Sequence, residues 1–409
     1  MKVGLISLGC PRNKVDSEKI LFRLKNKGFK ITSPQASQIL IINTCAFIEP
    51  AKVESIETIK EALDLKRKGK LSKVIVWGCL VKRYKTLLAK YLKDIDALIG
   101  VINWENPQRI LSEPTHLSYL KIAEGCSNLC SYCAIPLIRG TLKSRKPETI
   151  LEEVRFLDKK GVKELNIVAQ DITSWGKDLY KRRDLVWLLE KILTETKNIA
   201  WLRLLYTHPK FLTKRLVKLI ATEEKICNYL DLPIQHINNR ILKLMNRQIT
   251  KQEIEEKINY LRREIPDIAL RTTLIAGFPT EKEEEFLELI EFIKKYKFWH
   301  LGAFLYSKEE NTKAYKLREL PRKLKKKRLR TIMETQQKIS YQINKSLVGK
   351  IFDVIIDESG IKFSVGRAYF QAYDIDTEII IPQRLKRGKF YKVKIIQSYE
   401  YDLLGKALT

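Results

Sequence analysis

Short apolar runs alternate with longer amphipathic segments over the first part of the chain, about residues 1–112. The runs are rich in β-branched residues and are continuous rather than alternating, which is typical of parallel strands buried on both faces. The expected strands are Leu5–Leu8, Ile39–Ile42 and Val74–Trp77, and the expected helices are Asp16–Lys27, Pro50–Lys66 and Lys82–Lys93. This repetition predicts an N-terminal open parallel α/β sheet domain.

The second part, about residues 113–340, repeats strand and helix at a longer spacing. The expected strands are Tyr119–Ala123, Glu164–Ala169, Trp201–Leu205, Tyr229–Leu232, Leu270–Ile275 and Leu301–Leu305. The expected helices include Glu148–Lys160, where Thr149 and Glu152 have capping-box spacing, Glu281–Lys295, and a long basic helix over Arg322–Asn344. Six such units predict an incomplete (β/α)6 barrel, since eight close the standard form.

The third part, residues 341–409, carries no helix-length pattern beyond the end of that basic helix. The expected strands are Ile351–Ile356, Lys362–Arg367, Glu378–Ile381 and Tyr391–Gln397, separated by turn residues. This pattern predicts a small antiparallel β-barrel.

Charge and composition narrow the class of protein. No apolar run approaches the roughly 18 residues that a membrane span needs, and no secretory signal precedes the first strand, so we expect a cytoplasmic protein without membrane contact. The formal net charge of +29 predicts attraction to a polyanion such as RNA, and basic residues cluster over 322–330. A lysine-rich proteome with solvated helix faces explains the same charge equally well.

Three closely spaced cysteines follow the first strand of the predicted barrel. Cys126, Cys130 and Cys133 have a C-x3-C-x2-C spacing. Three thiolates can hold a four-iron cluster and leave one iron open for chemistry. A zinc site would need a fourth ligand, and the four histidines (His116, His208, His236 and His300) lie outside finger-like spacing from Cys133.

Three further cysteines share a position, although they lie about 35 residues apart. Cys10, Cys45 and Cys79 each come just after a predicted parallel strand, and such strand ends meet at one edge of a sheet. Singly, each is more typical of a small buried side chain, but together they indicate a second thiolate triad. Cys227 enters a strand and is expected in the core.

Polar residues at the ends of other barrel strands are candidates for the pocket. Each one alone is also consistent with a hydrogen-bonded loop residue. They are Gln170, Asp171, Tyr206, His208, Gln235, His236, Gly277 and Tyr306, and Gly277 would let the backbone approach a nucleotide.

The motif Cys126-x3-Cys130-x2-Cys133, with Tyr132 before the last cysteine, resembles the radical-SAM signature. With three strand-end cysteines before it and a small β-barrel after it, the whole chain resembles the methylthiotransferase family. The resemblance implies an N-terminal cluster domain, an incomplete radical-SAM barrel and a C-terminal TRAM domain. It also implies that the six cysteines hold two 4Fe-4S clusters, and that Tyr132, Gln170, Gln235 and Gly277 contact the cofactor, S-adenosylmethionine (SAM).

Two branches of that family compete. One modifies an adenosine of transfer RNA, and the other, the RimO type, modifies an aspartate of a small-subunit ribosomal protein (S-twelve). Cys10-Pro11-Arg12-Asn13, Gln235-His236-Ile237, Val365-Gly366-Arg367 and Glu400-Tyr401-Asp402-Leu403 resemble the ribosomal branch. One stretch departs from it, because Ala372-Tyr373-Asp374-Ile375-Asp376-Thr377 replaces the common Ala-Pro-Glu-x-Asp-Gly run.

The resemblance implies a reaction in which SAM, bound to the cluster on Cys126, Cys130 and Cys133, is cleaved to a radical that removes hydrogen from the aspartate β-carbon. The second cluster would hold the sulfur to be inserted, and a second SAM would supply the methyl group. An electron donor and a sulfur donor are implied partners. The C-terminal section has 11 Lys and Arg against 8 Asp and Glu, which suits a protein target better than naked RNA. The rival of another class is a non-enzymatic, metal-containing RNA-binding protein.

Overall fold

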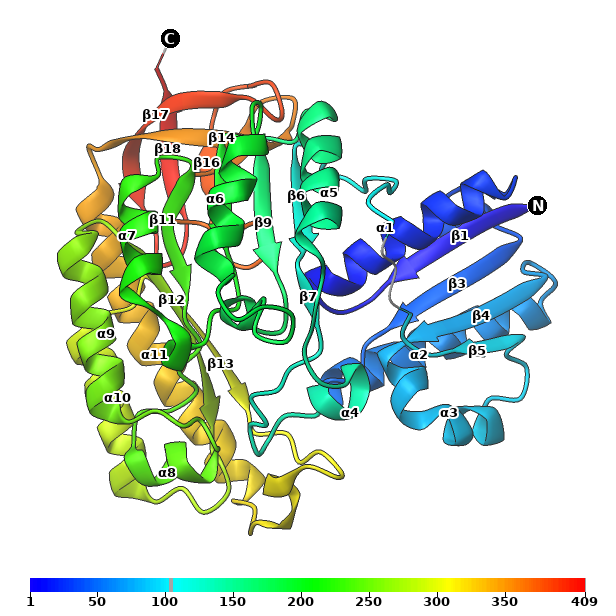
Figure 1. Ribbon diagram of the computed structural model, residues 1–409, viewed down its shortest axis with the longest axis horizontal. Helices are drawn as coiled ribbons and strands as arrows, with labels where there is room; N and C mark the ends of the chain where they lie inside the picture. Colours follow the sequence, from blue (N-terminus) through cyan, green and yellow to red (C-terminus); the bar gives the residue numbers. More distant parts are fainter. Residues whose placement is uncertain (103–105, 409) are drawn as a thin grey trace.

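The computed structural model describes residues 1–102 and 106–408. It has three parts in chain order (Figure 1), an N-terminal sheet domain, a central barrel and a small C-terminal barrel. Positions 103–105 of the predicted first section and position 409 of the predicted third section lie outside the described residues.

The N-terminal domain is a five-stranded parallel sheet in the order β2-β1-β3-β4-β5. All six residues of its central strand are buried, which explains the uninterrupted apolar run in the sequence. Its elements are β1 (Lys2–Ser7), α1 (Pro11–Asn26), β2 (Lys30–Ile31), η1 (Pro34–Ala36), β3 (Ile39–Thr44), α2 (Glu49–Arg67), β4 (Lys73–Gly78), α3 (Cys79–Tyr91) and β5 (Ala97–Ile99). The predicted open parallel sheet is confirmed.

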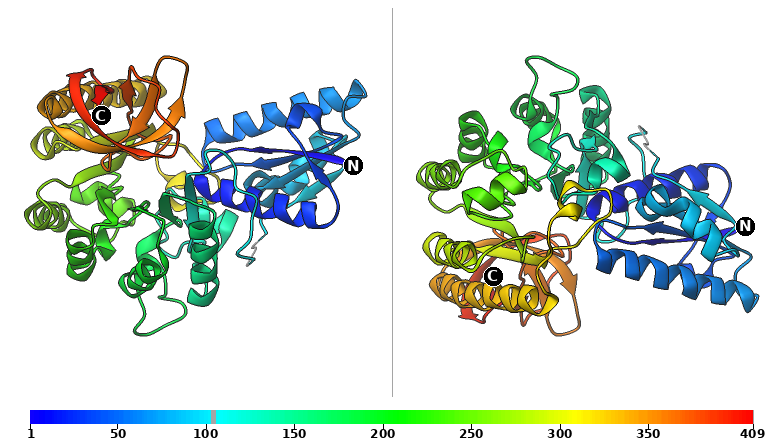
Figure 2. Two further views of the ribbon diagram at one scale, coloured as in Figure 1. Left: turned by 90° about the horizontal axis from the view of Figure 1, so that it is seen from above. Right: turned by 90° about the horizontal axis from the view of Figure 1, so that it is seen from below.

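The central part is a six-stranded parallel sheet with its strands in chain order, β6-β9-β10-β11-β12-β13. Its strands are β6 (Leu117–Lys121), β9 (Glu164–Val168), β10 (Trp201–Leu204), β11 (Ile226–Asp231), β12 (Ala269–Ala276) and β13 (His300–Leu305). The two edge strands do not pair, so the predicted incomplete barrel is confirmed. Figure 2 shows its helices in an arc on the outer side of the sheet.

Helices of the central part pack on the sheet through a continuous apolar core. They are α5 (Pro147–Lys159), α6 (Leu185–Glu195), α7 (Lys214–Thr222), α8 (Asn239–Leu244), α9 (Lys251–Glu264), α10 (Glu283–Tyr296) and α11 (Arg322–Leu347), with the short turns η2 (Ile172–Ser174), η3 (Pro209–Phe211) and η4 (Lys313–Lys316). The expected capping box at Thr149 and Glu152 is wrong. Helix α5 begins at Pro147, two residues before Thr149, so Thr149 lies inside the helix and its hydroxyl donates to the Lys146 carbonyl.

A small excursion follows the first barrel strand and carries the three closely spaced cysteines. It comprises a two-stranded hairpin, β7 (Ala123–Glu124) with β8 (Lys143–Ser144), and the short helix α4 (Ile135–Arg139). The segment from Cys126 to Cys133 lies between β7 and α4.

The C-terminal part is a closed five-stranded barrel of β14 (Ile351–Ser359), β15 (Ser364–Arg367), β16 (Ile379–Ile381), β17 (Phe390–Ser398) and β18 (Leu403–Ala407). The predicted small barrel is confirmed, but its pairing is mixed because β16 and β18 run parallel. Buried ion pairs fix it to the central barrel, since Glu164 of β9 accepts from both Arg203 and Arg367 at 2.7 Å. Within the described residues, every helix is too short or too polar to span a membrane.

Candidate active site

One cavity of about 650 Å³ brings together residues from all three parts of the chain. Five of the six predicted cluster cysteines line it, namely Cys10, Cys45, Cys126, Cys130 and Cys133. Cys79 lies behind this surface and is only 8% exposed. A larger groove of about 840 Å³ lies between the two barrels, and Cys227 is the one cysteine among its lining residues. The smaller cavity is therefore the candidate site, because most of the predicted cluster cysteines line it.

The first cysteine triad is held by the loop between β7 and α4. The backbone N–H of Cys126 donates to the carbonyl of Gly140 at 3.1 Å, and the N–H of Cys133 donates to the carbonyl of Cys130 at 3.1 Å. Ser131, between these cysteines, donates from its backbone to Met245 and accepts from Ala314. The loop is thus fixed from two sides before any cofactor binds.

Burial dominates the acidity of these thiols. It raises the pKa of Cys126 to about 11 and that of Cys133 to about 12, and the neighbouring charge of Cys130 acts in the same direction on both. A guanidinium is close as well, because Nη1 of Arg247 lies 3.6 Å from Sγ of Cys130. Buried thiols of this kind stay protonated at neutral pH unless a metal displaces the proton.

The second triad sits at the carboxyl edge of the N-terminal sheet, as the sequence predicts. Strands β1, β3 and β4 are neighbours, with Ser7 in register with Asn43 and Asn43 in register with Trp77. Their ends therefore lie side by side, and each is followed within a few residues by Cys10, Cys45 or Cys79.

Two glycines allow these strand ends to approach one another. Gly9 (φ +86°) precedes Cys10, and a Cβ at this position would lie 2.7 Å from Cβ of Cys45. Gly78 (φ +105°) precedes Cys79, and a Cβ there would lie 2.5 Å from Oδ1 of Asn43. Only glycine combines this backbone conformation with this closeness. The Gly-Cys pairs are a sequence signal for the triad that the spacing argument did not use.

The surroundings of the second triad shift the pKa values of its three thiols in different directions. Burial alone would raise the pKa of Cys10, but the charges of Arg12 and Arg139 and the backbone N–H of Asn13 outweigh it and lower that pKa. Burial raises the pKa of Cys45 to about 11 and also raises that of Cys79. Nη2 of Arg139 donates to Sγ of Cys79 at 3.3 Å and to Oδ1 of Asn13 at 2.6 Å.

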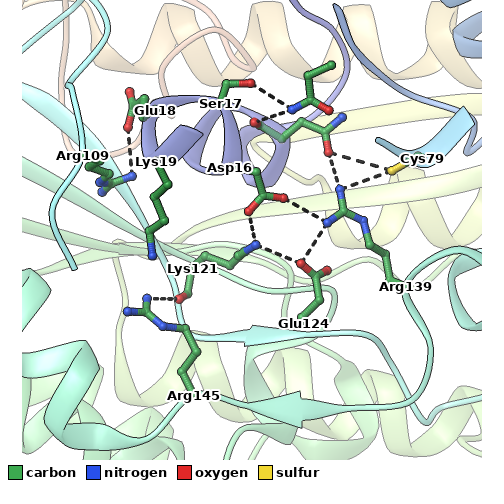
Figure 3. A network of polar contacts seen from close by, with 12 residues as sticks. Asp16, Ser17, Glu18, Lys19, Cys79, Arg109, Lys121, Glu124, Arg139 and Arg145 are labelled. Atoms are coloured by element: carbon green, nitrogen blue, oxygen red, sulfur yellow. Dashed lines mark hydrogen bonds and ion pairs between the residues drawn. The ribbon is translucent and has the colours of Figure 1, made fainter. Parts of the chain in front are cut away.

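A buried network of charges crosses the junction between the N-terminal domain and the barrel (Figure 3). Asp16 of α1 pairs with both Lys121 of β6 and Arg139 of α4, and both of these cations also pair with Glu124 of β7 at 2.9 Å. Burial alone would raise the pKa of Glu124, but the charges of Lys121 and Arg139 lower it to about 2. Arg139 is therefore shared between the junction and Cys79.

A second set of ion pairs lies close by and joins α1 to α5. The carboxylate of Glu153 accepts a hydrogen bond from Lys19 at 3.1 Å, forms an ion pair with Arg145 at 2.7 Å, and lies 3.3 Å from Nε of Arg109. Across the cavity, Glu309 pairs with Lys52 at 3.2 Å and with Arg83 at 2.5 Å. The N-terminal domain is thus fastened to the barrel on two sides of the cavity.

The predicted pocket residues divide into two groups. Tyr132, Gln170, Asp171, Tyr206, His208, Gln235 and Tyr306 line the cavity. Gly277 does not, because its Cα faces α11, where a Cβ would lie 2.5 Å from Cγ of Lys325. His236 also lies away from it, fully buried, with Nε2 3.0 Å from Glu281.

The cavity-lining polar residues differ in what they can offer a ligand. Nε2 of Gln170 donates to Glu124 at 2.5 Å, whereas its Oε1 is buried without a partner among the described residues. Gln235 has a positive φ of 71°. The carboxylate of Asp171 already accepts hydrogen bonds from Thr173, Ser174 and Asn128. Burial and the charge of Arg247 lower the pKa of His208 to about 2, so this imidazole is neutral.

The donor set fits iron–sulfur clusters better than a single ion. All six cysteines are free thiols. Among the described residues, no three His, Cys, Asp or Glu side chains converge closely enough to hold one metal ion. A cluster distributes its thiolates over different irons, so its ligands need not converge on one point. Three thiolates would also leave one iron of a four-iron cluster without a protein ligand.

Sequence reasoning missed several charged residues of this site. Arg12, Arg247 and Arg271 line the cavity, and Glu124 and Arg139 tie it to the domain junction. Their roles depend on partners far away in the chain, although Arg12 lies close to a cysteine that the sequence did identify.

Comparisons with known proteins agree with this arrangement. Residues 2–100 match the family described as "Uncharacterized protein family UPF0004", residues 120–293 the radical SAM superfamily, and residues 348–408 the TRAM domain. Among solved structures, a radical SAM methyltransferase, TsrM from Kitasatospora setae, superposes with a TM-score of 0.54 at 13% identity, over 89% of this chain and 80% of that one. That likeness shows the shared fold.

Curated relatives match the chain from end to end. The ribosomal protein uS12 methylthiotransferase RimO of Thermoanaerobacter sp. is 45% identical, over 98% of this chain and 99% of its own. The proteins of the same name from Aquifex aeolicus and Acetivibrio thermocellus are 44% and 42% identical, each over at least 97% of both chains. By its sequence, and with a predicted pair of cysteine triads on one cavity, the chain belongs to the RimO family of radical-SAM ribosomal protein uS12 methylthiotransferases.

Proposed function

We propose that this enzyme adds a methylthio group to the β-carbon of an aspartate in ribosomal protein uS12, using two SAM molecules and two 4Fe-4S clusters. The observation that carries the proposal is that five of the six thiols, from both triads, line one cavity of about 650 Å³. Such a cavity is large enough for a side chain together with a small cofactor.

Cys126, Cys130 and Cys133 are the proposed ligands of the SAM-binding cluster, and Cys10, Cys45 and Cys79 those of the second cluster. When bound, these groups supply the one-electron chemistry that activates an unreactive C–H bond and the sulfur that replaces the hydrogen. Tyr132, Gln170 and Gln235 are proposed SAM contacts, and their position in the lining of the same cavity supports this. Gly277 is not in that position, so its proposed contact would have to be indirect.

The protein's own residues position these groups and keep water out. Phe47, Ile48 and Ile275 give the cavity apolar walls, which protects a reactive intermediate from side reactions. Tyr373, Asp374 and Ile375 of the C-terminal barrel also line the cavity. These three residues belong to the stretch that departs from the common pattern of the family, so we propose that they contact the substrate protein.

Helix α11 supports an additional contact with ribosomal RNA. Lys323, Lys326, Lys327 and Arg330 are exposed and share one face of the helix, whereas Lys325 and Arg328 turn inward to Glu319 and Glu281. Of these exposed residues, only Arg330 has an ion pair among the described residues, with Glu334.

The exposed cations of α11 oppose the helix dipole. Its first turn contains no acidic residue, as in α1 and α7, whereas α2, α5, α9 and α10 each have an acid in the first turn and a base in the last. Basic residues at a helix N-terminus reduce its stability. We propose that this exposed face, where three of the four cations have no ion pair among the described residues, binds RNA phosphates beside uS12 on the small subunit.

Mass analysis of uS12 and of digested transfer RNA from a strain lacking this enzyme tests the proposal. We expect uS12 to lose a methylthio mark on one aspartate and to regain it when the gene is restored. Loss of the mark from a tRNA adenosine alone would support the other branch of the family. Zinc in place of iron, with no SAM cleavage under reducing conditions, would support a non-enzymatic RNA-binding protein. A uS12 substrate also places the enzyme in the cytoplasm.

A further inference from the structure

Arg12 reaches across the domain junction into the space between the two triads. It lies in the first turn of α1, two residues after Cys10, and it lines the cavity. Its Nη1 donates to the carbonyl of Ala169 at 2.7 Å, just past the end of β9. Its Cζ lies 4.8 Å from the ring centroid of Tyr206, a cation–π contact. The guanidinium is therefore held in one place by the barrel.

The charge of Arg12 affects thiols of both triads. Arg12 lies two residues after Cys10, and its charge acts on the thiols of Cys10, Cys45 and Cys133. A negatively charged group bound to Arg12 would consequently lie beside both proposed clusters. Arg247, in contrast, contacts Cys130 of one triad and the carbonyl of Pro233.

The charge of Arg12 has no carboxylate partner. None of the ion pairs among the described residues includes it, whereas Arg271, in the same cavity, pairs with Asp231 at 3.1 Å and with Asp376 at 3.2 Å. A guanidinium has five N–H donors, and among the described residues the carbonyl of Ala169 is the one hydrogen-bond acceptor that Arg12 reaches. Arg12 is half-buried, and a guanidinium in such a position without a carboxylate partner is available to bind an anion.

We propose that Arg12 binds the side-chain carboxylate of the aspartate that is modified. This inference rests on the proposed function and extends it to a substrate contact. A planar guanidinium binds a carboxylate through two parallel hydrogen bonds, which fixes orientation as well as position. The β-carbon is bonded directly to that carboxylate, so this contact holds it between the triads. SAM also carries a carboxylate, which is the alternative ligand of Arg12, and the test distinguishes the SAM carboxylate from that of the aspartate.

The test is a double-mutant cycle measured by binding rather than by turnover. The proteins are the reconstituted wild-type enzyme and its Arg12→Gln and Arg12→Lys variants. The ligands are uS12 and a uS12 variant whose modified aspartate is asparagine, and Kd is measured with SAM present. The matched control is Lys14→Gln, which removes a charge from the same helix turn at a residue that donates to the Glu113 carbonyl and does not line the cavity.

The wild type and Lys14→Gln should prefer the aspartate form by about 10- to 100-fold. Arg12→Gln should bind both forms with the same, weaker affinity, and Arg12→Lys should keep part of the preference because a lysine retains the charge. Each variant is checked for iron content and for its Kd for SAM.

Three results would overturn the inference: an undiminished preference in Arg12→Gln, a changed Kd for SAM with that preference intact, or a loss of four irons, which would make Arg12 a support for the cluster at Cys10. If the wild type does not modify uS12 at all, the proposed function fails instead.

Discussion

Replacing Glu153 by glutamine should destabilise the contact between the N-terminal domain and the barrel more than replacing any exposed charged residue. Glu153 is fully buried and balances three cations, Lys19, Arg109 and Arg145. Removing one partner of a buried ion pair typically costs about 3–5 kcal/mol. Burial alone would raise the pKa of Glu153, but the charges of Arg145 and Arg109 lower it to about 2. The difference from the ordinary value of 4.5 corresponds to about 3 kcal/mol.

Urea unfolding followed by circular dichroism and tryptophan fluorescence measures this effect. For a transition with a slope of about 3 kcal/mol per M, the midpoint of the first transition should fall by about 1 M. The matched control is Glu195→Gln, because Glu195 pairs with Arg155 at 2.8 Å with side chains that are 29% and 54% exposed. That control should change the free energy of unfolding by less than about 1 kcal/mol.

The pH dependence provides a second check on the same residue. Because the folded pKa of Glu153 is depressed, its contribution to stability is complete above about pH 4.5 and is lost as the pH falls toward 2. The difference between wild type and Glu153→Gln should therefore shrink between pH 5 and about pH 3. Equal losses in the Glu153 and Glu195 variants, or a difference that does not change with pH, would refute the reasoning.

Three further predictions concern the clusters and the basic helix. Gly78→Ala should lower the iron content by about four per chain, because a Cβ would clash with Oδ1 of Asn43. Gly69→Ala should not lower it, because Gly69 also has a positive φ but has open space around it. Equal iron content in the two variants would contradict this. Replacing Cys126, Cys130 and Cys133 by alanine should abolish reductive SAM cleavage, while alanine at Cys10, Cys45 and Cys79 should leave it; loss in both variants would argue against separate roles. Replacing Lys323, Lys326 and Lys327 by glutamine should reduce the salt dependence of binding to small ribosomal subunits by a slope of about three, and leave binding to free uS12 unchanged. An unaltered slope would remove the case for phosphate contacts at this face.

The fold was largely predictable because strands of the two parallel sheets such as β3, β6 and β9 are buried along their whole length, and many of the helices are amphipathic. The elements that sequence reasoning missed are short or depend on distant partners. Strands β2 and β5 have two and three residues, too few to show a period. The parallel pairing of β16 with β18 depends on how the last barrel closes, and local sequence carries little information about that.

The candidate site was predictable where position along a strand determines it. The cysteines and most of the polar residues after barrel strands face one cavity because parallel strands end at one edge. The same rule fails at Gly277, where the chain turns toward Lys325, and at His236, which pairs with Glu281 instead. Arg12 and Arg139 could not be identified this way, since the contacts that place them in the site, with Ala169 and with Cys79, span 157 and 60 residues of sequence.

Iron and acid-labile sulfide per chain, measured after anaerobic reconstitution, test the central claim of two clusters on one cavity most directly. The wild type should hold about eight irons and eight sulfides, and alanine at either cysteine triad should reduce each to about four. About four irons in the wild type, falling to none when Cys126, Cys130 and Cys133 are replaced, would leave one cluster. That result would contradict the account, because Cys10, Cys45 and Cys79 would then have no part in delivering sulfur.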